Sequence, residues 1–319
     1  MLNPLYIIIT AYKAQNYIEL CLDSVATQIK PKKCPKIKVL IGIDGCKETL
    51  SKVKEIRDKY GSNFEFYYSE ENHGTYMIKN SLLEKVQDKN SLILFFDADD
   101  FMPQNFLDKY YTLFTEVKKS IQDEDIIIRT RSFNIKNEYL PEKLVYYDNN
   151  ISRLLTDLNK NRKTNIKSFF ETCIHLLGMN LNIEKAEKIL EAMNREQLLE
   201  CLRQGNFFGP FNHQYPDFPY GVFFVLYPTL EKLSFFNTDR VSQDSDFHNR
   251  AGLMGVKNYE FINSPLFIRR ISDTSLVTSN NYGWNSNLRK QIIIKNINRL
   301  NNKNIIADRK VTELKIVAK

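Results

Sequence analysis

Three aspartates follow the most apolar segment of the chain. The stretch LILFFDADDF places Asp97, Asp99 and Asp100 directly after a run of strand length. Side chains alternate along an extended chain, so Asp97 and Asp99 lie on one side of it. Two carboxylates this close repel each other unless a hard divalent cation joins them, and such a cation also holds phosphate. The pattern predicts a metal site. In the alternative, Asp99 and Asp100 cap the next helix, which explains one acid but not three.

The surrounding sequence predicts a parallel sheet that positions these acids. Apolar runs of strand length occupy residues 5–11, 37–44, 64–69 and 91–97. Helical patterns cover residues 16–25, with Asn16 as the expected cap, then 50–60, 75–86 and 106–117. Strands that alternate with helices indicate an α/β fold with a mostly parallel sheet covered on both faces. Such sheets bind ligands at the carboxyl ends of their strands.

The middle of the chain has a different composition. Residues 151–204 show helical patterns without intervening strands, which predicts a helical insertion. Residues 205–221 read GNFFGPFNHQYPDFPYG, and this mixture of glycine, proline and aromatic residues is typical of an irregular loop that carries a site. Strand-like segments then return in GVFFVLY and FINSPLFIRRI.

Taken in order, several motifs resemble those of the inverting nucleotide-sugar glycosyltransferases of the GT-A fold, family 2 in particular. The motifs are IIITAY, IGIDG, the NHG loop, the D-x-D pair Asp97 and Asp99, and SQDSDFHNRAG. The resemblance covers most of the chain. It implies a GT-A fold, which is Rossmann-like with flanking helices, in addition to the helical insertion. It also implies transfer of a sugar, with a UDP-sugar as the favoured donor and Mn²⁺ or Mg²⁺ as the cofactor.

The resemblance also implies which residues bind the donor. Asp44 would hydrogen-bond the uracil ring, Asp97 would contact the ribose and Asp99 would bind the metal. The other donor-binding residues would be Thr10, Ala11, Tyr12, Asn72, Gly74, Lys79 and Ala98.

Asp244 falls on the position of the family's catalytic carboxylate. Gln243 replaces the usual Glu before it, and Asp246 and Arg250 follow in step. Inversion at a sugar carbon needs a base that removes the proton of the acceptor hydroxyl, and a metal stabilises the departing diphosphate. Without the resemblance, Asp244 and Asp246 would be interpreted as acids that complement the dipole at the start of a helix.

The last motif departs from the family pattern. In FIRRISDTS, Ser272 stands where the family's metal-binding His aligns. Water could replace this ligand, another residue such as His248 could complete the site, or the alignment could be shifted by one residue. Arg269 and Arg270 would in any case neutralise diphosphate.

The remaining candidates are weaker. Asp246 and His213 are candidates for acceptor contacts, while His73 and His175 are interpreted as structural. Trp284 is either part of a flap over the sugar and donor or a core residue.

These observations divide the chain into four parts. Residues 1–150 would form the donor half with the D-x-D motif, 151–204 the insertion, 205–280 the acceptor and catalytic half, and 281–319 a basic helical tail. The acceptor would be a glycan or a glycosylated protein or lipid.

Composition and charge limit which other functions and partners the protein can have. The 319 residues carry 45 Lys and Arg against 38 Asp and Glu, a net charge of +7. The segment 289–319 alone accounts for this charge, so the remainder is neutral. Its stretches QIIIKNINRL and VTELKIVAK have the spacing of amphipathic helices, which predicts solvated helical faces. Nucleic-acid binding is not expected, and a weak contact of the tail with anionic membranes is the further partner considered.

The five cysteines show no disulfide or zinc pattern and are interpreted as reduced thiols. No apolar run reaches 18 residues, and the apolar start is too short for a signal peptide, so we predict a soluble, cytoplasmic protein.

Two rival functions remain open at this point. A sugar nucleotidyltransferase would share the sheet, but TAYKAQNY after the first strand lacks the glycines of a phosphate loop. A catalytically silent protein that binds glycan or nucleic acid is the other rival, which Gln243 and Ser272 leave open.

Overall fold

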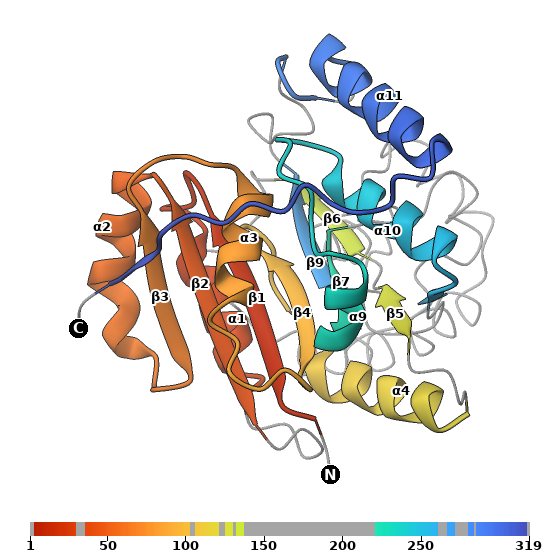
Figure 1. The fold of residues 1–319 in the computed structure, drawn as a ribbon. Helices are drawn as coiled ribbons and strands as arrows, with labels where there is room; N and C mark the ends of the chain where they lie inside the picture. Colours follow the sequence, from red (N-terminus) through yellow and green to blue (C-terminus); the bar gives the residue numbers. More distant parts are fainter. Residues whose placement is uncertain are drawn as a thin grey trace, which may run out of the picture.

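The computed structural model in Figure 1 describes nine stretches of the chain. They are residues 3–29, 36–102, 106–120, 125–129, 132–136, 221–260, 267–271, 280–283 and 285–317. The predicted insertion (151–204) lies outside the described residues, as do His213, Ser272 and Trp284.

An eight-stranded sheet with a parallel centre forms the frame of the described part. Its strands are β1 (Leu5–Ala11), β2 (Ile37–Asp44), β3 (Phe64–Ser69), β4 (Leu92–Asp97), β5 (Ile126–Arg129), β7 (Phe223–Leu226), β8 (Lys257–Glu260) and β10 (Lys315–Ile316). The strand order is β10-β3-β2-β1-β4-β7-β5-β8. Strands β1 to β4 are parallel, β7 is antiparallel to β4 and β5, and β10 is antiparallel to β3. Strands β6 (Ser132–Lys136) and β9 (Phe267–Ile271) form a separate parallel pair.

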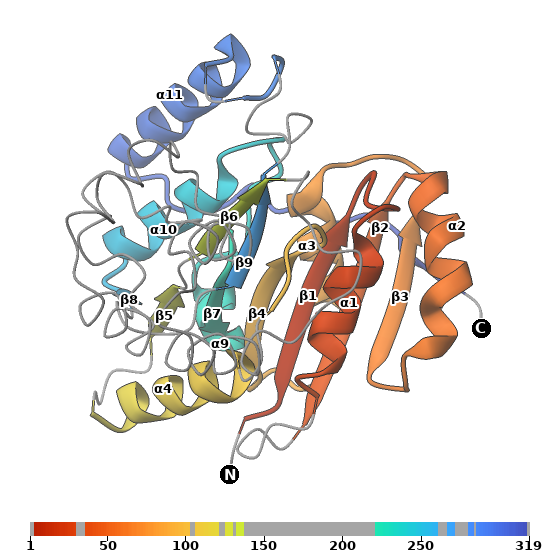
Figure 2. The same ribbon diagram turned by 180° about the vertical axis from the view of Figure 1, so that it is seen from behind.

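Helices cover both faces of this sheet. They are α1 (Ile18–Ala26), α2 (Lys47–Ile56), the short 3₁₀ helix η1 (Arg57–Lys59), α3 (Thr75–Leu83), α4 (Phe106–Ser120), α9 (Tyr227–Lys232), α10 (Gln243–Leu253) and α11 (Asn287–Asn301). Helices α1 and α2 lie in front of the sheet in Figure 2, and α3 lies on the opposite face.

The side chains of β1 show why helices must cover both faces of the sheet. Leu5, Ile7 and Ile9 are buried in one core with residues of α1, α2 and α4, whereas Tyr6 and Ile8 are buried in a second core with residues of α3, α9 and α10. The alternation follows from the pleat of the strand. The predicted α/β fold, with a mostly parallel sheet between helices, is therefore confirmed.

The start of α1 differs from the prediction that Asn16 caps it. The residue before the helix is Tyr17, which makes no side-chain capping hydrogen bond. Instead, the amides of Tyr17 and Ile18 bond to the carbonyl oxygen of Ala14 at 2.9 and 2.8 Å. Backbone groups thus satisfy donors that a capping side chain would otherwise take.

Helix α3 packs unusually close to β2 because Gly42 has no side chain. A Cβ on Gly42 would lie 2.4 Å from Cγ2 of Ile78 and 3.1 Å from Cδ1 of Leu82. Both residues belong to α3 and are fully buried. Gly42 therefore sets the depth at which α3 rests on the sheet.

The C-terminal part confirms one predicted helix and corrects the other. QIIIKNINRL lies in α11, whose first turn is capped by the side chain of Ser286. The described part of VTELKIVAK, in contrast, is not helical: Lys315–Ile316 forms β10, and the amide of Val317 bonds to the Phe66 carbonyl at 2.8 Å. The open edge of β3 offers backbone partners to this segment, whereas a helix of this length is marginal on its own.

In the stretches given above, none of the helices combines the length and the apolar character needed to span a bilayer.

Candidate active site

The predicted uracil-binding residue Asp44 ends β2 and holds the NHG loop. Its Oδ1 accepts the amide of His73 at 2.7 Å, and its Oδ2 accepts the amide of Gly74 at 2.9 Å and Nδ2 of Asn72 at 3.1 Å. Burial raises the pKa of Asp44, while the two backbone hydrogen bonds favour its ionised form. Two motifs that lie far apart in the sequence therefore form one unit.

Gly45 makes this contact possible. Its φ is +65°, and a Cβ there would lie 2.4 Å from the amide nitrogen of Asn72. Any other residue at this position would be strained and would push the loop away.

Arg240 joins the same loop and was missed by the sequence analysis. Its guanidinium bonds to the side-chain oxygen of Asn72 and, at 3.2 Å, to the Asn72 carbonyl. Arg240 belongs to no motif, so only the fold reveals a cation next to Asp44.

The predicted donor-binding residues at the end of β1 differ in their contacts and in their exposure. The hydroxyl of Thr10 lies 2.6 Å from that of Thr75, and Thr10 pairs in register with Asp97. Ala11 is buried, whereas Tyr12 is 50% exposed. Thr10 and Tyr12 thus lie at the carboxyl edge of the sheet, and Ala11 belongs to the core.

The D-x-D motif lies at the end of β4 as a compact group of carboxylates. The side chain of Asp97 is 43% exposed, and its Oδ1 lies 3.7 Å from Nζ of the buried Lys79. Burial, and then the charge of Asp97, raises the pKa of Asp99. Burial, followed by the charges of Asp99 and Asp97, raises the pKa of Asp100 well above its usual value. Ala98, which lies between Asp97 and Asp99, is buried.

Arg270 is the cation that faces this group. Its Nη2 donates to Oδ2 of Asp99 at 2.9 Å, and its backbone amide donates to Oδ1 of Asp100 at 3.1 Å. The guanidinium carbon lies 3.5 Å from the ring centroid of Tyr17, so the group is also held by stacking. The neighbouring Arg269 acts on Asp100 through its charge. The two predicted arginines therefore lie at the D-x-D motif.

Asp244 faces the D-x-D motif across Gly221. A Cβ on Gly221 would lie 3.6 Å from Oδ2 of Asp97 and 4.0 Å from Oδ2 of Asp244. The Oδ1 atom of Asp244 accepts the Tyr76 hydroxyl at 3.2 Å and the Ser245 amide at 2.8 Å. Gly221 ends the loop 205–221 whose composition indicated a site, but neither Gly221 nor Tyr76 stands out as an individual residue, because a glycine in a loop and an aromatic residue in a helix are ordinary.

Asp246 does not share this site, which corrects its assignment as an acceptor or diphosphate contact. It is 1% exposed, and its carboxylate accepts Nε of Arg250 at 2.9 Å, Nδ2 of Asn237 at 2.6 Å and the guanidinium of Arg299. Asp246 follows Asp244 by two residues, about half a turn of α10, so it points away from Asp244 and into the core.

Helix α11 contributes Arg289 near Asp244. Burial lowers the pKa of Arg289, while the neighbouring Tyr76 and Asp244 favour its protonated form. Its Nε donates to the Tyr282 carbonyl at 2.7 Å. The sequence analysis assigned this helix only to the basic tail.

His248 is placed as a structural residue. Its Nδ1 lies 3.1 Å from Oδ1 of Asn258, and its ring centroid lies 4.8 Å from that of Phe223. Among the described residues, no group of three or more His, Cys, Asp or Glu side chains is arranged to hold a metal ion.

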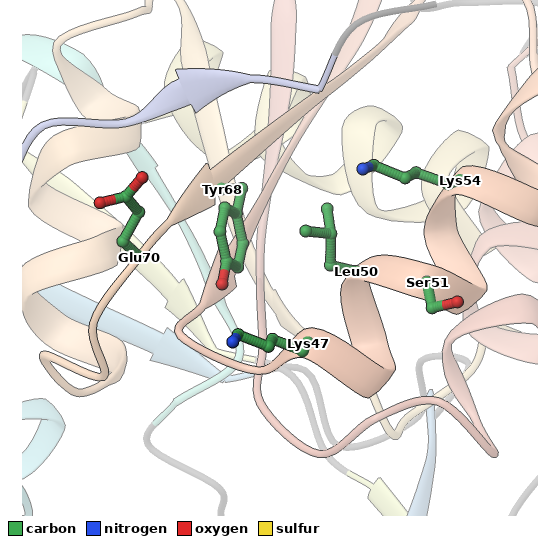
Figure 3. Close-up of a pocket in the computed structure, with 6 residues that line it drawn as sticks. All are labelled: Lys47, Leu50, Ser51, Lys54, Tyr68 and Glu70. Carbon is green, nitrogen blue, oxygen red and sulfur yellow. The ribbon is translucent and has the colours of Figure 1, made fainter.

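A separate groove lies between α2 and β3. Figure 3 shows Tyr68 between Glu70 and Leu50, and the lining is completed by Lys47, Ser51 and Lys54. It includes none of the carboxylates described above, so it is distinct from the candidate active site.

The strand order and the acids at the carboxyl edge define an α/β fold of the GT-A type. A mannosyltransferase from Pyrobaculum calidifontis, solved with GDP-Man and Mn²⁺, is similar with a TM-score of 0.53 and 13% identity, over 94% of this chain and 65% of that one. TarS from S. aureus, solved with UDP-GlcNAc, gives a TM-score of 0.47 and 13% identity, over 85% and 60%. At such identities only the fold is comparable.

The chain belongs to glycosyl transferase family 2, whose family model matches residues 6–177. The curated teichoic acid poly(glycerol phosphate) polymerase of Staphylococcus epidermidis is 28% identical over 190 residues, which are 57% of this chain and 24% of the relative. The match thus spans about a quarter of that larger protein.

Proposed function

We propose that this protein transfers a sugar from a nucleotide donor, with a UDP-sugar favoured, to an acceptor hydroxyl with inversion. The observation that carries the proposal is the position of Gly221, beside Oδ2 of both Asp97 and Asp244. A donor-side carboxylate and a candidate base then border one space. A single displacement needs this arrangement, because the acceptor oxygen must lie in line with the leaving diphosphate.

The residues at the D-x-D motif fit a divalent cation. Asp97 and Asp99 are hard oxygen ligands whose charges repel each other, and their side chains remain 43% and 34% exposed. Mg²⁺ is usually held by one or two carboxylates together with phosphate oxygens and water, so two protein ligands are sufficient. Asp97 and Asp99 would hold Mn²⁺ or Mg²⁺, which when bound supplies charge stabilisation for the leaving diphosphate.

The other residues would bind and orient the donor. Asp44 and the NHG loop, with Arg240, would hold the nucleotide base. Lys79 and Arg270 already neutralise Asp97 and Asp99, and their charges would also attract the diphosphate. Asp244 would take the acceptor proton through Oδ2, the oxygen that faces Gly221.

We keep the division of the chain into two halves as part of the proposal, with Arg240 and Arg270 of the second half also serving the donor. Residues 1–150 would serve the donor, and residues 205–280 would serve the acceptor and the chemistry. A glycan or a glycosylated protein or lipid remains the proposed acceptor, and the name of the S. epidermidis relative adds poly(glycerol phosphate) to the acceptors worth testing.

A donor screen tests the proposal. UDP- and GDP-sugars are incubated with Mn²⁺, Mg²⁺ or chelator, with and without acceptor, and the released nucleoside diphosphate is measured. We expect release from a UDP-sugar in the presence of metal and a large loss in chelator, because unscreened carboxylates repel the diphosphate. Asp99→Asn should also lose release, because it removes a proposed ligand of the metal. Equal release of nucleoside diphosphate in chelator and in metal would refute the dependence on a metal. No release from any donor would favour a catalytically silent binding protein.

Asp244→Asn tests the base. Asn keeps the size of Asp but cannot take a proton, so we expect kcat to fall at least about a hundredfold while the donor KM changes little. Turnover at the level of the unsubstituted protein would remove Asp244 from the mechanism.

A further inference from the structure

The two oxygens of the Asp244 carboxylate have different surroundings. Both hydrogen bonds described above end on Oδ1, from the Ser245 amide at 2.8 Å and the Tyr76 hydroxyl at 3.2 Å. Oδ2 lies toward Gly221, 4.0 Å from the position of a Cβ there. Two donors on one oxygen fix the rotation of the carboxylate and direct the other oxygen to the space beside Asp97.

Tyr76 is well suited to hold this carboxylate. It is the second residue of α3, it is 8% exposed, and its ring centroid lies 5.8 Å from that of Phe236. Nζ of Lys79 lies 5.7 Å from the same ring. The side chain is therefore packed from two sides, and its hydroxyl has little freedom to turn away from Asp244.

The protonation of Tyr76 is also fixed. Burial, and then the charge of Asp244, raises the pKa of Tyr76 well above the usual value of 10.0. The phenol thus stays protonated over the whole range in which an enzyme works, and it remains a hydrogen-bond donor.

We propose that Tyr76 is a positioning residue for the transfer reaction, which holds the Asp244 carboxylate with Oδ2 directed at the acceptor hydroxyl. This inference rests on the proposed function, since it assigns Tyr76 to the base of that reaction. A base acts only within hydrogen-bond reach of the proton, and a small misplacement lowers the rate without weakening donor binding. A merely structural tyrosine would instead affect stability alone.

Tyr76→Phe removes the hydroxyl and leaves the ring in place. We expect kcat to fall about ten- to hundredfold, with the donor KM unchanged within about twofold. Tyr60→Phe is the matched control, because the Tyr60 hydroxyl also donates to an aspartate, Oδ1 of Asp23 at 2.8 Å, on elements that hold none of the site carboxylates. A kcat of Tyr76→Phe equal to that of Tyr60→Phe, or a loss expressed only in KM, would overturn the inference.

The double variant shows whether Tyr76 acts through Asp244. In the Asp244→Asn background, Tyr76→Phe should change kcat by less than about twofold, because Asn takes no proton wherever it points. Losses that multiply would overturn the inference. Normal turnover of Asp244→Asn alone would refute both the proposed base and the role of Tyr76. Normal turnover of Tyr76→Phe beside an inactive Asp244→Asn would refute only the role of Tyr76.

Discussion

Gly221 lies where two carboxylates from distant parts of the chain converge. A methyl group there would be in ordinary van der Waals contact with Oδ2 of Asp97 and Oδ2 of Asp244, at 3.6 and 4.0 Å. The fold therefore has room for alanine, but the methyl group would occupy space that the proposed transfer requires.

We expect Gly221→Ala to lower kcat at least about tenfold while the unfolding temperature changes little, because the substitution affects the site and not the packing. Steady-state kinetics and thermal unfolding test this expectation. Gly252→Ala is the control, since a Cβ on Gly252 of α10 would meet nothing within 4 Å. Unchanged kinetics in Gly221→Ala would show that the reacting groups lie elsewhere.

Asp100 makes the stability of the fold depend on pH. It is 3% exposed, and its raised pKa results first from burial and then from the charges of Asp99 and Asp97. A carboxyl group with a higher pKa in the folded state stabilises the fold below its unfolded value, here 3.8, and this contribution is lost as the pH rises through the folded value.

Asp100→Asn should therefore become more stable relative to the unsubstituted protein as the pH is raised from about 4 to about 8. Asn still accepts the Arg270 amide through its oxygen. Urea unfolding in chelator measures the difference, and Asp58→Asn, whose side chain is 80% exposed, controls for the loss of one charge. A difference that stays constant with pH would contradict the burial effect.

Among the elements, α3 connects most parts of the site. Gly74, which directly precedes the helix, contacts Asp44, while Tyr76 contacts Asp244 and Lys79 lies near Asp97. Gly42 sets the depth of the helix, so a strand residue that touches none of these acids controls the position of all three contacts.

Gly42→Ala should push α3 away from β2, because its Cβ would lie 2.4 Å from Ile78. We expect a loss of about 1–3 kcal/mol in the free energy of unfolding, together with weaker donor binding and lower turnover. Gly61→Ala, with nothing within 4 Å of its Cβ, should leave all three unchanged. Loss of stability with normal kinetics would show that α3 absorbs the methyl group without moving.

The elements also show what sequence patterns can predict. The first strands were predicted almost to the residue because their apolar runs are continuous, as in LYIIITA of β1. The strands β5 and β8 were not predicted because each has only four residues, and KNYE of β8 contains no apolar run. The segment VTELKIVAK, which contains β10, was predicted as a helix because its apolar residues are compatible with both periods.

The candidate site divides in a similar way. Asp44, Asp97 and Asp244 are predicted from motifs, and the fold brings Asp97 and Asp244 together. Tyr76 and Gly221 could not be found, since their roles depend on distances between elements. The burial of Asp246 depends on which side of α10 faces the core, and the motif alone does not show this.

At the scale of the whole molecule, Asp246 joins α10 to α11. Removing its charge leaves the buried Arg250 without its ion pair and weakens the hold on Arg299. We expect Asp246→Asn to cost about 3–5 kcal/mol in the free energy of unfolding, the usual effect of breaking a buried pair.

Asp239→Asn provides the matched control, because Asp239 also pairs with α11, through Lys295 at 2.9 Å, but on the surface. It should cost at most about 1 kcal/mol. Chemical denaturation of the two variants compares them directly, and equal losses would contradict the structural role of Asp246.

The segment after α11 crosses α3 and reaches the far side of the sheet, as the dark blue trace in Figure 1 shows. On its way it bonds to Asn80, Ser81 and His73, and it ends as β10 against β3. An uncovered strand edge can pair with the same edge of another molecule. By occupying the edge beside Tyr67 and Tyr68, residues 315–317 keep this aromatic strand from serving as a template for aggregation.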